Sequence, residues 1–68
     1  MDDFPERLQK LRERRHISRR VLSELCGLDH DAVRRFERRE GVPSVAALIA
    51  LADYFEVSVD WLVGRTNY

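Results

Sequence analysis

Cysteine is scarce in this sequence, and so are the other residues from which many small functional sites are built. One cysteine and two histidines occur among 68 residues. A zinc site needs three or four ligands and an internal disulfide needs two thiols, so we expect neither. The sequence also has no Ser/His/Asp set, no paired carboxylates of the acid–base type and no glycine-rich phosphate loop. We therefore expect that the protein is not an enzyme and binds no cofactor.

Long hydrophobic runs are absent too. The longest, from Val45 to Ala52, is far shorter than the ~20 residues needed to cross a bilayer. Asp2 and Asp3 are acidic where a secretory signal would be basic. We therefore expect no membrane association and a cytoplasmic location. The length predicts one domain over residues 1–68, whose core supplies only ~3–5 kcal/mol.

The net charge is zero, but the charges are unevenly distributed. From Arg7 to Arg39 there are eleven basic and five acidic residues, whereas residues 41–68 contain one basic and three acidic residues. Exposed charges act within a Debye length of ~8–10 Å, so DNA phosphates respond to the local potential and not to the total. A neutral chain of this kind can present a basic face to nucleic acid.

Two short helices joined at a glycine form the clearest pattern. Ser18 is a suitable N-cap for a helix over residues 19–26. Gly27 can adopt the positive φ that lets the chain turn sharply. Asp29 is then placed to cap a second helix over residues 30–38, which is apolar on one side and basic on the other. This layout is that of a helix-turn-helix.

Three further helices are predicted around this pair. Asp3 and Glu6 form a capping-box pattern that begins a helix over residues 4–15, with Phe4, Leu8 and Leu11 as its buried stripe. A helix over residues 45–55 is apolar almost all round, which predicts a buried central element. The last, over residues 59–63, is capped by Ser58 and ended by Gly64. The expected fold is an all-α, compact five-helix bundle.

The segments around the first helix of the pair are PERLQKLRERRHIS before it, GLDHDAVRRFERR for the turn and the second helix, and VPSVAALIALADYFEVSVDWLVGRT for the last two helices. Together they resemble, without a gap, the phage-repressor and Cro-like family of regulators, of the xenobiotic-response-element type. The resemblance implies a lambda-repressor-like DNA-binding domain with its helix-turn-helix at about residues 18–39. It also implies a sequence-specific transcription regulator, which we expect to be a repressor, and a double-stranded DNA operator as its partner.

The second helix of the pair supplies the candidate DNA contacts. A major groove of ~12 Å admits one helix, whose first residues reach base edges while its flanks meet phosphates. The candidate base readers are His30, Asp31, Arg34 and Arg35. The candidate phosphate contacts are Arg19, Arg38 and Arg39. Asp29 and Asp31 are acidic at positions where the resembled family commonly carries neutral or basic residues. They repel DNA unless Asp29 caps the helix and Asp31 accepts a hydrogen bond from cytosine.

Two charged residues are predicted to lie on the packed side of the fold. Arg12 shares the inward stripe of the first helix, and Glu37 lies beside the apolar face of the third. The family pairs an Arg and a Glu at the matching positions, which implies a structural salt bridge here. Two separately solvated side chains are the alternative. For Cys26, at a position that is a buried Leu in the family, we expect a place in the core.

A homodimer is expected because one recognition helix reads only a few base pairs. The candidate dimer interface is on the last helix and comprises Val59, Leu62 and Val63. Two other functions stay open. The chain can be the antitoxin of a toxin–antitoxin pair, with a toxin as its protein partner, or a helix-turn-helix module that binds another regulator instead of DNA.

Overall fold

A computed structural model describes residues 3–67, and these residues form five α-helices and no strand. Residues 1, 2 and 68, which the sequence assigns to the same domain, lie outside the described part. The helices are α1 (Phe4–Arg14), α2 (Arg19–Leu25), α3 (Ala32–Glu37), α4 (Val45–Phe55) and α5 (Val59–Leu62). The predicted all-α fold is therefore confirmed for residues 3–67.

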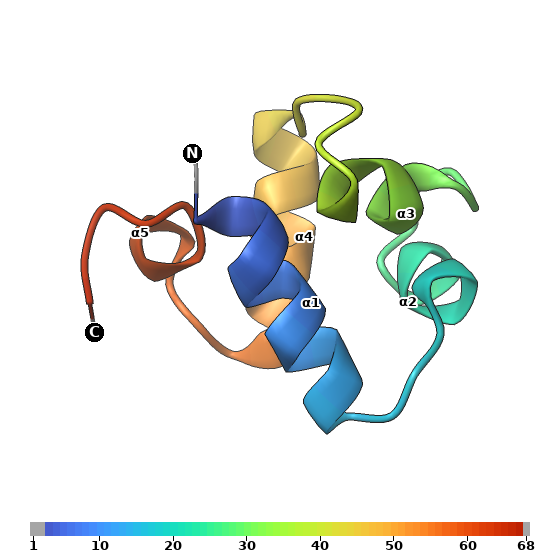
Figure 1. Cartoon of the computed structure of the whole chain (residues 1–68), viewed down its shortest axis with the longest axis horizontal. Coiled ribbons are helices and arrows are strands. Elements are labelled where there is room, and N and C mark those ends of the chain that lie inside the picture. Colours follow the sequence, from blue (N-terminus) through green and yellow to red (C-terminus); the bar gives the residue numbers. More distant parts are fainter. Residues whose placement is uncertain (1–2, 68) are drawn as a thin grey trace.

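The helix-turn-helix pair occupies one side of the molecule. Figure 1 shows α1 and α4 in the middle, with α2 and α3 to one side and α5 to the other. Helix α2 packs against α3, while α1 contacts both α3 and α5. Arg7 of α1 binds α5, because its guanidinium donates to the main-chain oxygen of Trp61 and lies 4.6 Å from the centre of the Trp61 ring. The outer sides of α2 and α3 are thus left open to solvent.

All five helices contribute to one hydrophobic core. Its buried side chains are Phe4, Leu8, Leu22, Ala32, Val33, Phe36, Ala47, Leu48, Leu51, Ala52, Phe55 and Leu62. The rings of Phe4 and Phe36 lie 5.8 Å apart and join α1 to α3. The placement of Leu62 in a dimer interface was wrong, because this side chain is completely buried in the core of the single chain. Val59 and Val63 are half-buried at its edge.

Helix α4 is less enclosed than its apolar sequence predicts. Leu48, Leu51 and Phe55 are buried, but Val45 is 72% and Ile49 48% exposed. The other helices cover only one side of α4, so its remaining apolar residues reach solvent. The buried stripe predicted for α1 is also narrower than expected, because Leu11 is only half-buried at the edge of the core.

The helix ends differ from the prediction at one place and agree at others. The backbone of Asp3 is already helical, and its side chain makes no capping hydrogen bond, so the predicted capping box does not form. Instead, the Asp3 carboxylate lies 3.7 Å from Nη2 of Arg7. Ser58 accepts from the main-chain N–H of Trp61 at 3.0 Å, and Gly64 follows α5 with φ of 85°, as predicted.

Candidate nucleic-acid interface

The cap of α2 and the glycine turn that follows it are built as the sequence predicts. Ser18 has an extended backbone, and its hydroxyl accepts from the N–H of Val21 at 3.1 Å, so it caps α2. Gly27 has a φ of 70°, a region that glycine enters without steric cost. The turn is closed by the N–H of Leu28, which donates to the main-chain oxygen of Ser23 at 2.8 Å.

Ser23 fixes how the two helices sit together, and sequence reasoning missed it. Its side chain is completely buried. The hydroxyl donates to the main-chain oxygen of Arg19 at 2.8 Å and accepts from the N–H of Val33 at 3.0 Å. A residue of α2 thus satisfies one of the free donors in the first turn of α3. The sequence signal that could have revealed Ser23 is its position, four residues after Arg19 and next to the buried Leu22.

Helix α3 begins two residues later than predicted, and Asp29 does not cap it. The Asp29 carboxylate accepts from the N–H of Asp31 at 3.2 Å, and the Asp29 main-chain oxygen accepts from Ala32 at 2.9 Å. These bonds form a tight turn over His30 and Asp31 ahead of the helix. The reason is local competition, since a short aspartate side chain bonds its own backbone two residues on as readily as it caps a helix.

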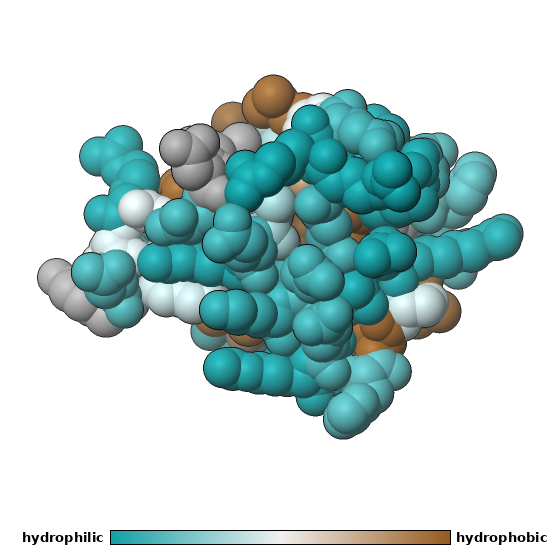
Figure 2. Space-filling model, in the orientation of Figure 1, coloured by the Kyte–Doolittle hydropathy of each residue, from teal (hydrophilic) through white to brown (hydrophobic). Residues whose placement is uncertain are grey.

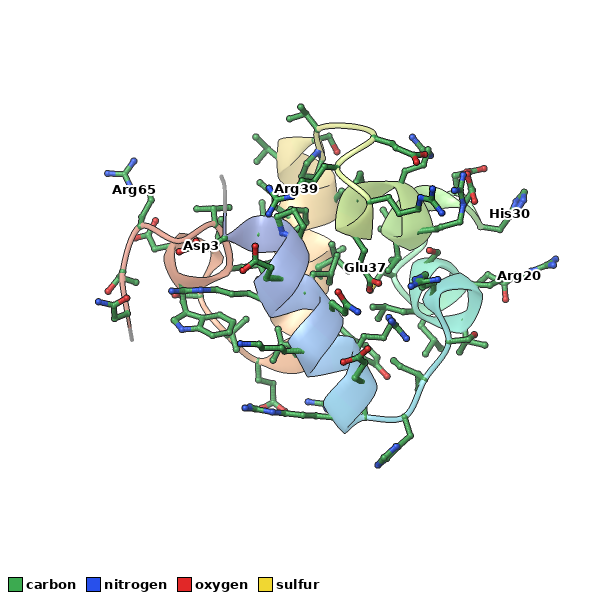
Figure 3. The ribbon with its side chains drawn as sticks, in the orientation of Figure 1. Asp3, Arg20, His30, Glu37, Arg39 and Arg65 are labelled. Atoms are coloured by element: carbon green, nitrogen blue, oxygen red, sulfur yellow. The ribbon has the colours of Figure 1, made fainter. Side chains whose placement is uncertain are left out.

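An open groove of about 500 Å³ lies where the first turns of α2 and α3 meet. Its lining comprises Arg12, Ser18, Arg19, Arg20, His30, Asp31 and Arg34. Three of the four predicted base readers, His30, Asp31 and Arg34, therefore line one groove. The fourth, Arg35, lies beside them through its contact with Asp31. Arg20 was not predicted, although its position next to Arg19 at the start of α2 indicates it. Figure 3 shows His30 and Arg20 extending outward at the same edge of the molecule.

The arginines of α3 have carboxylate partners within the chain. Arg34 donates to both oxygens of Asp31, with Nε–Oδ1 at 2.6 Å and Nη2–Oδ2 at 2.8 Å. Arg35 is held more loosely, 3.6 Å from Asp29 and 3.7 Å from Asp31. The hydrogen bond from Arg34 lowers the pKa of Asp31 and, reciprocally, raises the pKa of Arg34. Both aspartates are thus partly neutralised at the groove.

A buried ion cluster joins this surface to α1. Arg12 binds both oxygens of Glu37, with Nε–Oε2 at 2.7 Å and Nη2–Oε1 at 3.1 Å, so the predicted pair is confirmed. The Glu37 side chain is only 2% exposed and that of Arg12 11%. Arg12 also donates to the main-chain oxygen of Ile17 at 3.0 Å, and the Glu37 hydrogen bond raises its pKa. In Figure 3, Glu37 points back from α3 toward α1 and away from the outer edge.

The three predicted phosphate contacts lie in different places. Arg19 lines the groove, but its Nε donates to Glu37 at 2.9 Å. Arg38 is 61% exposed and donates to Glu40 at 2.9 Å. Arg39 follows α3 with a left-handed φ of 61° and donates to Glu6 of α1 at 2.8 Å. Figure 3 shows Arg39 well away from His30, so the structure does not bring it to the groove.

Outside the groove, residues 3–67 offer no metal-type cluster and no membrane-spanning helix. The face in Figure 2 is almost entirely hydrophilic, with hydrophobic atoms emerging mainly at its edges. Among these described residues, no group of His, Cys, Asp and Glu could hold a metal ion, and no helix is long and apolar enough to span a membrane. Cys26 is half-buried against the edge of the core, not enclosed as expected, and this burial raises the pKa of its thiol.

Comparison with known proteins identifies the family. A helix-turn-helix family profile matches residues 8–62. The chain belongs to this helix-turn-helix family. It is 30% identical over 60 residues to the cryptic phage CTXphi transcriptional repressor RstR of Vibrio cholerae, which covers 88% of this chain and 54% of RstR. It is 28% identical over 61 residues to the transcriptional activator BcrR of Enterococcus faecalis, which covers 90% of this chain and 30% of BcrR.

Solved structures agree with this helix-turn-helix assignment. The P22 c2 repressor in complex with a synthetic operator matches with a TM-score of 0.84 and 27% identity, over 93% of this chain and 96% of that one. The DNA-binding domain of the same repressor in solution matches with a TM-score of 0.78 and 28% identity, over 88% and 79% of the two chains. The fold is that of a phage-repressor DNA-binding domain. The chain spans about half of RstR and less than a third of BcrR.

Proposed function

We propose that this chain is a sequence-specific DNA-binding transcription regulator that acts as a repressor and places α3 in the major groove of an operator. The proposal is supported by its membership of the helix-turn-helix family, and by its likeness to RstR and to the P22 c2 repressor solved with operator DNA. The observation that carries it is the groove at the first turns of α2 and α3. That groove gathers basic side chains on the outer side of helices whose inner sides form the core.

The chemistry at this groove suits DNA. Arg34 and Arg35 are 40% and 38% exposed, so they can reach outward to base edges that offer paired acceptors, as guanine does. The hydroxyl and guanidinium groups at the start of α2 suit phosphate oxygens on the flanking strand. The carboxylates beside these arginines are negative, so they reduce the non-specific attraction of the groove to phosphates.

We further propose that two copies bind together on DNA, because a single helix-turn-helix reads only a few base pairs. With Leu62 in the core, the candidate contact on α5 is reduced to Val59 and Val63. Two recognition helices related by a two-fold axis read half-sites about one helical turn, ~34 Å, apart. Operator DNA of a bacterium or phage lies in the cytoplasm, so this function places the chain there.

Selection from a pool of random duplexes tests the function. We expect an enriched sequence with two symmetric half-sites, bound with log K falling by about 0.9 for each phosphate that the protein neutralises as log salt rises. Arg38→Ala removes a cation beside α3 and should weaken binding almost equally on all sequences. Arg65→Ala is the matched control, because Figure 3 places Arg65 at the opposite edge from His30, and it should leave binding unchanged.

Two results would contradict the proposal. No enrichment and no binding at low salt would mean that the module binds protein, as an antitoxin or interaction domain can, and not DNA. Binding with an affinity that stays flat between low and moderate salt would contradict docking of the basic groove on phosphates.

A further inference from the structure

One arginine of α3 is held in a fixed orientation and its neighbour is not. Arg34 and Arg35 have nearly equal exposure, 40% and 38%, and the same carboxylate, Asp31, lies near both. Only Arg34 forms hydrogen bonds with it, two of them, at 2.6 and 2.8 Å. The shortest distance from Arg35 to a carboxylate oxygen is 3.6 Å, which is longer than a hydrogen bond. The two arginines therefore differ in freedom, although the sequence gives them the same role.

The geometry of the Arg34 pair leaves one edge of the guanidinium available. A guanidinium has five N–H donors in one plane. Asp31 engages the side edge, formed by Nε and one hydrogen of Nη2. The end edge, formed by Nη1 and the second hydrogen of Nη2, keeps two parallel donors, and the nearest other carboxylate, Glu40, is 3.7 Å from Nη1. Two parallel donors match O6 and N7 of guanine, which lie side by side in the major groove.

We propose that Asp31 is a positioning residue for Arg34, and that the two side chains read one guanine of each half-site as a unit. This inference rests on the proposed DNA-binding function. In this assignment Asp31 acts through Arg34, to which both of its oxygens bind, and not as the direct acceptor for cytosine that the sequence predicts. Its position on the groove lining supports the assignment, since Asp31 and Arg34 both border the place where base edges would enter.

Holding Arg34 this way favours the correct site over other sequences. The Asp31–Arg34 pair has no net charge, so it gains little from phosphates, which are present on every sequence. Among base edges in the major groove, its two remaining parallel donors match guanine, which offers both acceptors. A flexible, unpaired arginine would turn to the nearest phosphate instead, and would raise affinity for all DNA equally. Asp31 thus lowers non-specific affinity and preserves discrimination at one base pair.

The experiment compares four variants on the duplex enriched from the random pool. They are Asp31→Asn, Arg34→Ala, the double variant and, as a matched control, Glu40→Gln. Glu40 also lies near Arg34, but without a hydrogen bond to it, so its substitution removes the same charge and leaves the Asp31 pair intact. Dissociation constants are measured by anisotropy on the enriched duplex, on a scrambled duplex and on duplexes with single base pairs exchanged. Far-ultraviolet circular dichroism checks that each variant is folded.

We expect Arg34→Ala to remove the preference at one G·C pair of each half-site, a loss of about 5- to 150-fold for each half-site of the enriched duplex. Asp31→Asn should weaken the preference at that same pair by about tenfold and slightly strengthen binding to scrambled DNA. In the Arg34→Ala background, Asp31→Asn should no longer change any base preference. Glu40→Gln should strengthen binding to both duplexes alike.

Three outcomes would overturn the inference while the proposed function stands. The first is an equal gain on both duplexes for Asp31→Asn, which would make Asp31 a simple repulsive charge. The second is a base preference that Asp31→Asn alters even without Arg34, which would make Asp31 a direct reader. The third is an Arg34-dependent base pair that is not G·C. Absence of any enriched duplex would instead overturn the proposed function, and this inference with it.

Discussion

Loss of Glu37, whose charge is buried, should destabilise this domain more than loss of an exposed charge. The carboxylate is 2% exposed and accepts three hydrogen bonds, two from Arg12 and one from Arg19. Glu37→Ala leaves the Arg12 guanidinium, itself only 11% exposed, without a counter-charge. Breaking a buried pair in this way costs about 3–5 kcal/mol. That cost is comparable with the ~3–5 kcal/mol that a core of this size supplies.

Urea denaturation and thermal unfolding, followed by circular dichroism, measure the effect. We expect the unfolding temperature to fall by at least about 12 °C, since 1 kcal/mol shifts it by ~4–8 °C in a domain of this size. Arg19→Ala is the matched control, because the Arg19 side chain is 46% exposed and donates one hydrogen bond to Glu37, so its loss should cost only ~0.2–1 kcal/mol.

A double-mutant cycle of Arg12→Met and Glu37→Met separates the pair from its surroundings. Glu37→Met leaves the buried Arg12 guanidinium unpaired, and Arg12→Met leaves Glu37 with only the half-exposed Arg19. The double change removes both buried charges and replaces them by apolar groups. We expect a coupling well above 1 kcal/mol, the upper end of the range (~0.2–1 kcal/mol) for exposed ion pairs. A coupling near zero would refute the account of this cluster as the link between α1 and α3.

Three further predictions concern single sites. Ser23→Ala should lower the free energy of unfolding in urea by about 1–3 kcal/mol, because the N–H of Val33 loses its acceptor in the buried hinge; an unchanged midpoint would contradict this. Glu56→Gly should raise that free energy by about 1 kcal/mol, because Glu56 ends α4 with a left-handed φ of 57°, and Glu56→Ala should give no such gain. The Arg34 hydrogen bond lowers the pKa of Asp31. The pair therefore contributes stability above the ordinary aspartate pKa and loses it as pH falls through the lowered folded value. Carbon-13 NMR titration of the carboxyl group should give a midpoint below the ordinary value, and a midpoint above it would contradict the pair.

The helix order and the hinge were predictable because they depend on local signals. Ser18 and Gly27 act on their own neighbours, through a cap and a positive φ, and both do in the structure what the sequence indicates. The Arg12–Glu37 pair was predicted from the inward positions of both residues together with the family resemblance, and the structure confirms it. Local signals are sufficient for Ser18 and Gly27, whereas the Arg12–Glu37 pair also needed the family resemblance.

Other features depend on which surfaces meet, and spacing does not determine that. Leu62 and Ile49 have similar apolar neighbours in the sequence, yet one is completely buried and the other is half-exposed. Asp3 and Asp29 both match capping patterns, but each finds a different partner close by. The role of Ser23 needs α2 and α3 to be in contact before its hydroxyl has anything to cap.

The sequence predicts which residues form the candidate site better than it predicts how their side chains are arranged. His30, Asp31 and Arg34 border one groove, as expected of residues at the start of a recognition helix. Residues three or four apart on a helix can pair, so Asp31 could bind either Arg34 or Arg35. Only the side-chain geometry shows that Asp31 forms hydrogen bonds with Arg34 and not with Arg35. Arg39 lies away from the other candidate DNA contacts because its backbone adopts a left-handed φ after α3.

Mapping of backbone amide shifts by NMR, on titration of the chain with its enriched duplex, tests most directly the claim that α3 enters the major groove. The account predicts that the largest shifts fall on residues 18–20 and 30–38, around the groove lined by Ser18, Arg20, His30 and Arg34, with little change in α5 beyond any dimer contact. Shifts concentrated on the exposed side of α4, around Val45 and Ile49, with none at the groove, would contradict it.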